Sequence, residues 1–500
     1  MMWRAVLILS LPALSLIMAH DIGRLRKTLA AGNVYALFPD DNGYSQAAQA
    51  YNGRFIIGPI AIAYPKNAEQ VSTTIVAGAE QNIRVVSRSG GHSYIANGLG
   101  GKNGSLVVDM SNFSNLTLDS STNLATIQPG LRLGDIALML NDRGRAIPHG
   151  HCSTVGLGGH AAYGSWGFVS RQWGLTLDHI VSAQLVLANR TITTVSEDNN
   201  PELFWGIRGS ASSFGIVTYY EFSTVAVPEE GTYFVYDWNV SVAEASTFLT
   251  SLQGYVQSGI PSTLGIELRL LRGNIAGNLS ITLDGAYFGS HDSFTKTIKP
   301  YLDALVPPGL TTITQGNWIE TVAALTYGTL NTSTQAPIND TFYAKSLLTP
   351  EDSPLSKVAV DALMSYLDTA GFRTTDVFWF VEIELYGGSN SAINTVPVDQ
   401  TAFAHRNKLF NIQLYATSVV PPYPKDGFAF LNSITDVIIS NSPREWHYGA
   451  YINYPDNRLD DWQDLYYGSH YARLQALKKK FDPSNVFSFP LAIEGDTPLN

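Results

Sequence analysis

A glycine-rich stretch, residues 148–178, constrains the fold of this chain more than any other feature. It begins Pro148-His-Gly-His-Cys-Ser-Thr-Val-Gly-Leu-Gly-Gly-His160 and continues through Gly164 and Gly167 to Asp178. Glycine has no Cβ, so a backbone rich in glycine can approach another group closely. The residues around these glycines are largely apolar. The stretch therefore indicates backbone wrapped around a flat ligand.

Two other interpretations of this stretch remain open. One is a structural loop in which the glycines serve only close packing. The other is a metal site, since histidine and cysteine are natural ligands of zinc and copper, and the stretch offers His149, His151, Cys152 and His160. Their spacing matches no standard zinc finger, which makes the metal site the weaker alternative.

A second glycine motif lies upstream, after a predicted strand, and reads Arg88-Ser89-Gly90-Gly91-His92-Ser93-Tyr94. Adjacent glycines permit positive φ, so consecutive N–H groups can converge on a phosphate. A plain tight turn explains this short run equally well. The run is not the Gly-x-Gly-x-x-Gly fingerprint, so a nicotinamide-type site is not indicated.

Length and composition exclude several classes of protein. A chain of 500 residues exceeds what one hydrophobic core usually serves, which predicts two domains. Apolar residues make up 45% and charged residues 15% of the chain, which excludes disorder. The net charge of -11 opposes the positive field that a nucleic-acid surface needs, so no nucleic-acid partner is expected.

The N-terminus predicts export from the cell. Arg4 precedes an apolar run, residues 5–18, that is shorter than the ~20 residues that span a bilayer, so residues 1–19 are typical of a secretory signal peptide. No later stretch suits a membrane span, and no membrane partner is expected. Eight Asn-x-Ser/Thr triplets favour a glycosylated, secreted protein: Asn103, Asn112, Asn115, Asn189, Asn239, Asn278, Asn331 and Asn339.

Cys152 is the single cysteine of the sequence. Secreted chains usually pair their cysteines, and one cysteine cannot form a disulfide within its own chain. A free thiol in an oxidising compartment is either buried as a small hydrophobe or bonded to another group.

Hydrophobic periodicity predicts a mixed α and β fold in two parts. In the first part we expect strands at 60–64, 83–87, 105–109, 124–128, 182–187 and 191–195, and helices at 68–80 (capped by Asn67), 132–141 and 201–205. Residues 228–231, Pro-Glu-Glu-Gly, mark a boundary. Beyond it we expect strands at 232–238, 265–271 and 377–385 and helices at 242–257 and 356–369, a pattern that suits an antiparallel sheet with helices on one face.

After Asp456 the chain predicts one long amphipathic helix, which Asp482-Pro483 ends. Its apolar residues recur at helical spacing: Tyr467, Tyr471, Leu474, Leu477 and Phe481.

Together, the two glycine motifs resemble the signature segments of the vanillyl-alcohol-oxidase-type flavoproteins. Within that superfamily the match is to the berberine-bridge-enzyme-like branch, notably the fungal gluco-, xylo- and chito-oligosaccharide oxidases. Residues 201–209, Pro-Glu-Leu-Phe-Trp-Gly-Ile-Arg-Gly, and residues 481–487, Phe-Asp-Pro-Ser-Asn-Val-Phe, resemble two further family motifs. The resemblance implies an α+β fold in which a two-part FAD-binding domain, 20–227 and 457–500, carries an inserted substrate-binding domain, 228–456, built on an antiparallel sheet backed by helices.

The resemblance also implies the cofactor and the residues that hold it. In the family FAD is attached twice, by a histidine to the flavin 8α carbon and by a cysteine to flavin C6, and His92 and Cys152 fall at those positions. The other implied cofactor contacts are Arg88, Ser89, Gly90, Gly91, Ser93, Gly156, Gly159, His160, Gly164 and Ile216. No metal is expected.

For catalysis the resemblance implies Tyr454 as the base and Glu384 as its partner. A tyrosine with a pKa of ~10 is a poor base at neutral pH, but a carboxylate can accept the phenolic proton while the phenolic oxygen takes the substrate's. Glu384 aligns with an aspartate of the oligosaccharide oxidases, so its extra methylene shifts the carboxylate. The alternative is that Glu384 is an exposed carboxylate on a strand.

Substrate contacts are implied for Tyr94, Glu382, Gln413 and Tyr451. Glu382 stands where the family has a glutamine and Arg269 where it has a glutamate, so this groove is more highly charged than one for neutral sugars. The leading hypothesis is a secreted, monomeric oxidase that converts the reducing-end C1 hydroxyl of oligosaccharides to a lactone and O2 to hydrogen peroxide. The alternative is an FAD-linked oxidoreductase of fungal secondary metabolism that oxidises a small-molecule alcohol or closes a ring. A glycan-binding protein without catalysis is a third possibility.

Overall fold

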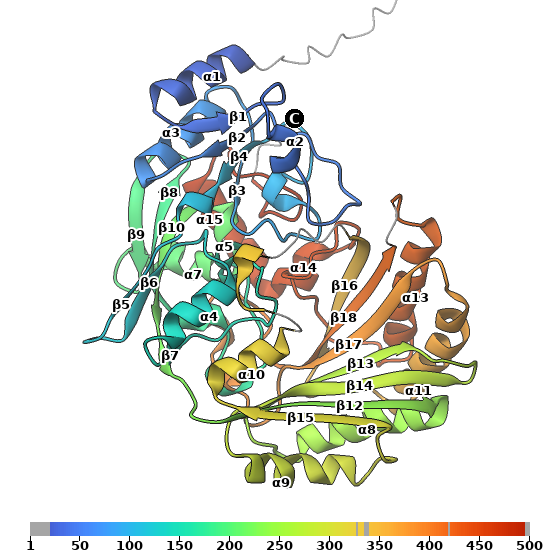
Figure 1. The fold of residues 1–500 in the computed structure, drawn as a ribbon. Helices are drawn as coiled ribbons and strands as arrows, with labels where there is room; N and C mark the ends of the chain where they lie inside the picture. The colour runs from blue at the N-terminus through green and yellow to red at the C-terminus, as the bar shows by residue number, and fades with distance from the viewer. Residues whose placement is uncertain (1–20, 327–328, 335–339, 419–420, 496–500) are drawn as a thin grey trace, which may run out of the picture.

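The computed structural model describes residues 21–326, 329–334, 340–418 and 421–495. The predicted signal peptide, residues 1–19, and Asn339 lie outside the described residues. Sheets and helices alternate as an α+β fold, with two sheets in the N-terminal half and a large antiparallel sheet in the C-terminal half (Figure 1). None of the helices in the described ranges combines the length and apolar character needed to cross a membrane.

The first sheet has the strand order β1-β2-β4-β3, with β2, β4 and β3 parallel. Its strands are Tyr35–Leu37 (β1), Ala61–Tyr64 (β2), Val85–Arg88 (β3) and Leu106–Asp109 (β4). Helix α3, Ala68–Ala79, connects β2 to β3 and begins where Asn67 Oδ1 accepts a hydrogen bond from the Gln70 amide at 2.9 Å. Helix α3 buries Val71 and Ile75 against the sheet together with residues of α1, Ile22–Ala31.

The second sheet is antiparallel, with the strand order β5-β6-β10-β8-β9. Its strands are Leu116–Asp119 (β5), Leu124–Ile127 (β6), Ile180–Leu187 (β8), Ile192–Ser196 (β9) and Gly215–Ser223 (β10). Two further short strands of this part, Arg145–Ala146 (β7) and Val225–Ala226 (β11), pair antiparallel with each other as a separate two-stranded sheet. The remaining helices of this half are Tyr44–Ala47 (α2), Leu133–Asn141 (α4), Leu157–Ala161 (α5), Ser170–Trp173 (α6) and Pro201–Ser210 (α7).

The third sheet is antiparallel and has seven strands within the described ranges, in the order β15-β12-β14-β13-β17-β18-β16. Its strands are Gly231–Ser241 (β12), Leu264–Arg272 (β13), Asn278–Tyr287 (β14), Leu310–Gly316 (β15), Thr341–Pro350 (β16), Phe378–Leu385 (β17) and Lys408–Ser418 (β18). The helices of this part are Val242–Gln257 (α8), His291–Leu302 (α9), Trp318–Leu325 (α10), Lys357–Tyr366 (α11), Ala392–Thr395 (α12) and Lys425–Ser440 (α13).

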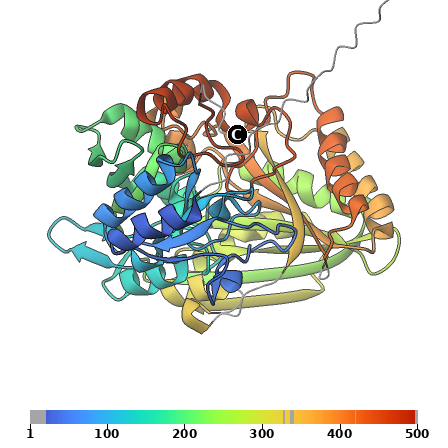
Figure 2. The same ribbon diagram turned by 90° about the horizontal axis from the view of Figure 1, so that it is seen from above.

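Side chains along these strands alternate between two faces of the seven-stranded sheet. On β17, Val381, Ile383 and Leu385 point into the apolar core that α8, α11 and α13 cover, which places these helices on one face as predicted (Figures 1 and 2). Glu382 and Glu384 alternate with them and are also buried, so they point to the opposite face. Carboxyls are rarely buried without a partner, so this second face is a candidate functional surface.

The prediction of one long C-terminal helix is wrong. The chain forms two α-helices, Trp462–Tyr467 (α14) and Tyr471–Phe481 (α15), on either side of a short 3-10 segment, Gly468–His470. Gly468 has φ 51°, a conformation that does not continue a right-handed helix and that glycine adopts easily. Leu474 and Leu477 of α15 pack with Leu203 and Phe204 of α7, so the C-terminal residues complete the N-terminal half of the molecule.

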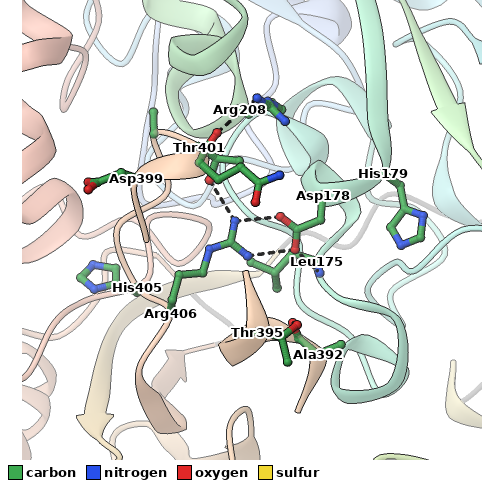
Figure 3. Close-up of polar contacts among 12 residues, drawn as sticks. Leu175, Asp178, His179, Arg208, Ala392, Thr395, Asp399, Thr401, His405 and Arg406 are labelled. Carbon is green, nitrogen blue, oxygen red and sulfur yellow. Dashed lines mark hydrogen bonds and ion pairs between the residues drawn. The ribbon is translucent and has the colours of Figure 1, made fainter. Parts of the chain in front are cut away.

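A buried ion pair connects the glycine-rich stretch to the loop before β18 (Figure 3). The Arg406 guanidinium donates to both oxygens of the Asp178 carboxylate, at 2.9 and 2.7 Å, and to Thr401 Oγ1 at 2.9 Å. Arg406 is 1% exposed. A bidentate pair of this kind fixes the position of the two segments relative to each other.

Candidate functional site

The two glycine motifs meet and form one wall of a pocket. Gly90 and Gly156 touch through their backbones: a Cβ on Gly156 would lie 2.0 Å from the Gly90 amide nitrogen, and a Cβ on Gly90 would lie 2.5 Å from the Gly156 nitrogen. Only glycine permits this contact, which explains why glycine occupies position 90 in the first motif and position 156 in the second. The pocket is also lined by residues of the seven-stranded sheet and of the chain after β18, including Glu382, Gln413 and Tyr454.

Most of the predicted cofactor residues line this pocket. They are Arg88, Ser89, Gly90, Gly91, His92, Ser93, Cys152, Gly156, Gly159 and His160. Burial lowers the pKa of His92 to about 4, so its imidazole is neutral, and the ring stacks on Tyr51 with centroids 3.7 Å apart. Burial also lowers the pKa of His160 to about 3, and its neutral Nε2 accepts a hydrogen bond from the Gly150 amide at 3.0 Å.

Two predicted cofactor residues do not line the pocket. Ile216 packs its side chain into the core between the first two sheets, and its neighbours Gly215 and Val217 line the pocket instead. Gly164 has φ +126° and lies against the ring of Phe403, where a Cβ would come within 2.8 Å. Gly164 therefore serves the packing of the glycine-rich stretch.

The pocket fits a flat cofactor such as FAD. Its wall at Gly90 and Gly156 lacks side chains, and a Cβ at Gly159 would meet no atom within 4 Å, so backbone faces the open space directly. Cys152 is exposed rather than packed as a small hydrophobe, and it lines the same pocket as His92. The donor set therefore offers a neutral imidazole and a thiol to one ligand.

The polar face of the seven-stranded sheet presents two rows of side chains, most of which are buried. Strand pairing aligns Asp284, Glu267, Glu384 and Asn411 in one row across β14, β13, β17 and β18. The neighbouring row holds Thr282, Arg269, Glu382 and Gln413. Residues two positions apart on a strand share a face, so both rows lie on the side away from the helices.

Glu384 is fully buried and bonded to Tyr454. The Tyr454 hydroxyl donates to Glu384 Oε1 at 2.5 Å, and the Asn411 side-chain amide donates to Glu384 Oε2. Burial raises the pKa of Glu384 to about 8, and the charge of Glu267 adds to this effect. Burial and the neighbouring Glu384 raise the pKa of Tyr454 well above its ordinary value, so the hydroxyl keeps its proton until the carboxylate accepts it. The alternative of an exposed Glu384 is wrong.

Arg269 neutralises the carboxyls beside this pair. Its guanidinium lies 2.7 Å from Glu267, 3.0 Å from Asp284 and 3.2 Å from Glu382. Glu267 and Glu382 also hydrogen-bond to each other. Burial raises the pKa of Glu382 well above its ordinary value. The pKa of Glu267 is lowered, because the hydrogen bond from Glu382 and the charge of Arg269 outweigh its burial. The hydrogen-bonded pair of carboxyls therefore shares one proton beside the Arg269 guanidinium.

An aromatic ring packs against the ring of Tyr454. Tyr94 lies parallel to Tyr454, with ring centroids 5.9 Å apart and planes 3° apart, and Tyr51 in turn stacks on Tyr94 at 6.4 Å. The Gln413 side-chain amide donates to the Tyr94 hydroxyl at 3.0 Å. The pocket thus offers apolar ring surface next to hydrogen-bonding groups, a combination that suits polyhydroxylated ligands.

Tyr451, a predicted substrate contact, lines the pocket but has its hydroxyl fully engaged. It accepts hydrogen bonds from the amides of Ser165 at 2.9 Å and Trp166 at 2.8 Å and from the Asn453 side chain at 3.1 Å. Tyr451 is 2% exposed. This geometry makes it a support for the glycine-rich stretch, two residues from Tyr454.

The histidines and Cys152 do not converge as metal ligands in the described part of the chain. Among the described residues, the group whose ligand atoms lie close enough to hold an ion is Glu267, Glu382 and Glu384. Arg269 already contacts two of these carboxyls. We therefore assign no cation to either set.

Sequence reasoning missed Glu267, Asn411 and Tyr51. Glu267 carries a detectable signal, because Glu267 and Arg269 are the two charged residues of the run 264–271, and a charge on such an apolar strand is costly to bury unless it has a partner. Asn411 and Tyr51 carry no such signal, since asparagine and tyrosine are common in strands and loops of any function.

Comparisons with known proteins find relatives over most of the chain. Residues 59–196 match the family described as FAD binding domain, and residues 450–494 match the family described as Berberine and berberine like. Xylooligosaccharide oxidase of Thermothelomyces thermophilus is 37% identical over 462 residues, which cover 89% of each chain. The FAD-linked oxidoreductase dpmaF of Metarhizium anisopliae is 36% identical over 462 residues, 90% of this chain and 87% of its own.

A solved structure has the same fold. It is the glucooligosaccharide oxidase from Acremonium strictum, described with a 6-S-cysteinyl, 8 alpha-N1-histidyl FAD. The two structures superpose with a TM-score of 0.88 at 32% identity, over 95% of this chain and 100% of that one.

Proposed function

Because this chain belongs to the berberine-bridge-enzyme-like family of FAD-linked oxidases, we propose that it oxidises the reducing-end C1 hydroxyl of oligosaccharides to a lactone. As a member it is an oxidoreductase that acts on CH–OH donors with O2 as acceptor. Hydrogen peroxide is the proposed second product. The observation that carries the proposal is the hydrogen bond from Tyr454 to the buried Glu384, in the pocket that also contains His92 and Cys152.

The chain's own residues supply the proton transfer. A hydroxyl is oxidised only if its proton leaves as the neighbouring C–H bond breaks, so the site needs a base in hydrogen-bond reach of that hydroxyl. The Tyr454 oxygen takes the substrate's proton while its own proton passes along the 2.5 Å bond to Glu384 Oε1. Asn411, which donates to the other carboxylate oxygen, fixes the orientation of Glu384.

FAD would supply the hydride acceptor for the substrate carbon and the path by which the electrons reach O2. We propose that His92 and Cys152 both bond to it, as in the histidyl and cysteinyl linkages described for the glucooligosaccharide oxidase. The neutral imidazole of His92 has a free electron pair for such a bond, because burial lowers its pKa to about 4. Gly90, Gly156 and Gly159 let the backbone approach the ligand.

Support for a sugar substrate comes from the walls around Tyr454. The ring of Tyr94, which stacks on Tyr454, offers an apolar face, and the side chains of Gln413 and Glu382 offer hydrogen bonds to hydroxyl groups. The xylooligosaccharide oxidase of Thermothelomyces thermophilus acts, by its name, on such a substrate.

One observation favours a second function. Glu382 and Arg269 place an ionisable row beside the site, and the similar protein dpmaF is an FAD-linked oxidoreductase without a sugar in its name. The second proposal is oxidation or oxidative cyclisation of a small molecule of fungal secondary metabolism. A charged or amine-bearing group on that molecule would lie against Glu382.

The protein is further proposed to be secreted, glycosylated and monomeric. Its predicted signal peptide and eight sequons support export. Six of the seven described sequon asparagines are exposed and Asn278 is partly exposed, so a glycan could be attached without unfolding.

An anaerobic titration of the purified protein tests the proposal. Cello-, xylo- and chito-oligosaccharides are added in turn while the visible absorbance of the flavin is recorded. Bleaching by one of these sugars is the expected result and identifies the substrate class. A flavin band that none of them bleaches contradicts the sugar proposal and directs the search to small metabolites, whereas the absence of a flavin band contradicts the cofactor.

A further inference from the structure

We propose that His151 is the acid–base partner of Cys152: it takes the thiol proton and keeps the sulfur as a thiolate for its bond to the flavin. The inference rests on the proposed function, since it concerns how FAD becomes attached. His151 acts through Cys152 and is therefore a positioning residue for the attachment. Nothing in the motif resemblance assigns it this role.

The two side chains are adjacent and in contact. His151 and Cys152 hydrogen-bond to each other, and both line the pocket with His92. The imidazole of His151 packs against the buried ring of Phe168, with ring centroids 5.5 Å apart and an interplanar angle of 53°. Held in this way, the ring nitrogen stays within reach of the sulfur.

The charges that face His151 come from three elements. Glu267 of β13 and Glu384 of β17 face it with carboxyls, and Cys152 faces it from its own loop. The neighbouring His149 and His160 are neutral, because burial lowers the pKa of each. His151 is therefore the histidine of this stretch that the surroundings favour in its charged form.

The pKa values agree with this arrangement. Burial by itself would lower the pKa of His151, but the thiolate and the two carboxylates outweigh it and raise the pKa to about 10. The pocket walls would raise the pKa of Cys152, but the charge and hydrogen bond of His151 lower it below its ordinary value. Both shifts favour an imidazolium beside a thiolate.

Formation of the sulfur–carbon bond requires the thiolate, since the thiol is a poor nucleophile. Sulfur replaces the hydrogen on flavin C6. His151 takes the thiol proton, the ring proton leaves to solvent, and the two electrons of the oxidation pass to O2. With two protons O2 becomes hydrogen peroxide, so one peroxide forms for each bond made.

The test compares wild type with His151→Gln. Glutamine keeps a hydrogen-bonding side chain of similar size but cannot hold the proton. Each protein is purified at pH 6 and denatured, and its free thiols are alkylated with iodoacetamide. The protein is then digested and analysed by mass spectrometry. The mass of the Cys152 peptide distinguishes a free, alkylated thiol from one linked to flavin, and the His92 peptide reports whether FAD is present.

We expect the wild-type Cys152 peptide to be linked and the His151→Gln peptide to be free, with FAD still on His92. Incubation of the variant in air at rising pH should restore the link, about tenfold faster per pH unit up to the thiol pKa of ~8.5. His149→Gln is the matched control: its Nδ1 lies 2.8 Å from the Gly150 carbonyl oxygen rather than near the sulfur, so its link should form as in wild type.

Other outcomes overturn the inference. A fully linked His151→Gln protein at pH 6 would show that the thiolate forms without His151. A variant that stays free at every pH, or an equal loss in His149→Gln, would mean that His151 only shapes the loop. Wild type with flavin on His92 and a free Cys152 refutes the double attachment and this inference with it, whereas wild type without any flavin refutes the proposed function itself.

Discussion

The hydrogen bond between Tyr454 and Glu384 joins side chains 70 positions apart in the sequence. Alternation along β17 places Glu384 on the face away from the helices, and the register of β17 with β18 sets Asn411 beside it. Neither residue alone could transfer the proton: the phenol has too high a pKa, and the carboxylate is buried behind it. The pair therefore works as one unit.

Tyr454→Phe is expected to lower turnover by a factor of about 10² or more, because it removes the oxygen that takes the substrate's proton. FAD content should be unchanged, since Tyr454 is not among the residues expected to hold it. Turnover and flavin absorbance of the purified variant measure both effects. Tyr35→Phe, at a side chain 62% exposed, is the control. Unchanged turnover in Tyr454→Phe would exclude Tyr454 as the base.

The pH dependence of turnover should report Glu384. Burial raises the pKa of Glu384 to about 8, and only the ionised form accepts the tyrosine proton. Turnover is therefore expected to rise about tenfold per pH unit below pH ~8 and to level off above it. Glu384→Gln should remove this limb and lower the rate by a factor of about 10² or more. A variant that keeps the wild-type profile would contradict the assignment.

The same carboxyl links stability to pH. Its pKa is raised in the folded state from an ordinary value of 4.5 to about 8, so the folded protein binds more protons between these values than the unfolded chain. Its contribution is present below pH 4.5 and is lost as the pH rises to about 8. Urea denaturation of wild type and Glu384→Gln at pH 5 and pH 8 would show whether the variant is less sensitive to the change.

At the scale of elements, two loops form the cofactor wall because the backbone of a glycine in one loop contacts the backbone of a glycine in the other. The loop after β3 contributes Gly90 and the turn before α5 contributes Gly156, and their backbones lie too close for any Cβ. The motifs could be read from the sequence, but their contact could not, because more than 60 residues of chain separate them. For the C-terminal helix the reverse holds. The apolar spacing correctly predicted helix α15, but the positive φ of Gly468 separates it from α14, so one long helix does not form.

Gly156→Ala is expected to destabilise the protein by about 1–3 kcal/mol and to reduce its FAD content. The new Cβ would lie 2.0 Å from the Gly90 nitrogen, so the two loops must separate. The free energy of unfolding and the ratio of flavin to protein absorbance measure the effects.

The matched control is Gly254→Ala in α8, where a Cβ meets nothing within 4 Å and alanine favours the helix. It should be neutral or slightly stabilising. Equal behaviour of the two variants would refute the proposed role of the Gly90–Gly156 contact.

At the scale of the whole molecule, the site exists only where the N-terminal half meets the seven-stranded sheet. The glycine motifs supply the cofactor wall, and β13, β17 and β18 supply the buried carboxyls and amides. The Asp178–Arg406 pair joins the glycine-rich stretch to the loop that leads into β18 (Figure 3). The position of the polar rows relative to the cofactor wall depends on such contacts.

Asp178→Asn is expected to lower the free energy of unfolding by about 3 kcal/mol, because it leaves the buried Arg406 charge without its counter-charge. Thermal and urea unfolding would measure the loss. Asp303→Asn breaks an exposed pair with Lys299 and should change stability by less than about 1 kcal/mol. Equal stability of Asp178→Asn and wild type would mean that the two segments are held by other contacts.

The sequence by itself determined the two glycine motifs and the capped helix after Asn67, and its resemblance to a known family implied the fold class and the candidate residues His92, Cys152, Glu384 and Tyr454. The motifs and the helix are local features, because glycine, capping residues and periodicity act through neighbours along the chain. Only the tertiary structure decided that Glu267 lies beside Glu384 and Arg269 beside Glu382, that Tyr451 supports a loop, and that Ile216 faces the core. Strand register and burial determine these placements, and both depend on contacts between residues far apart in sequence.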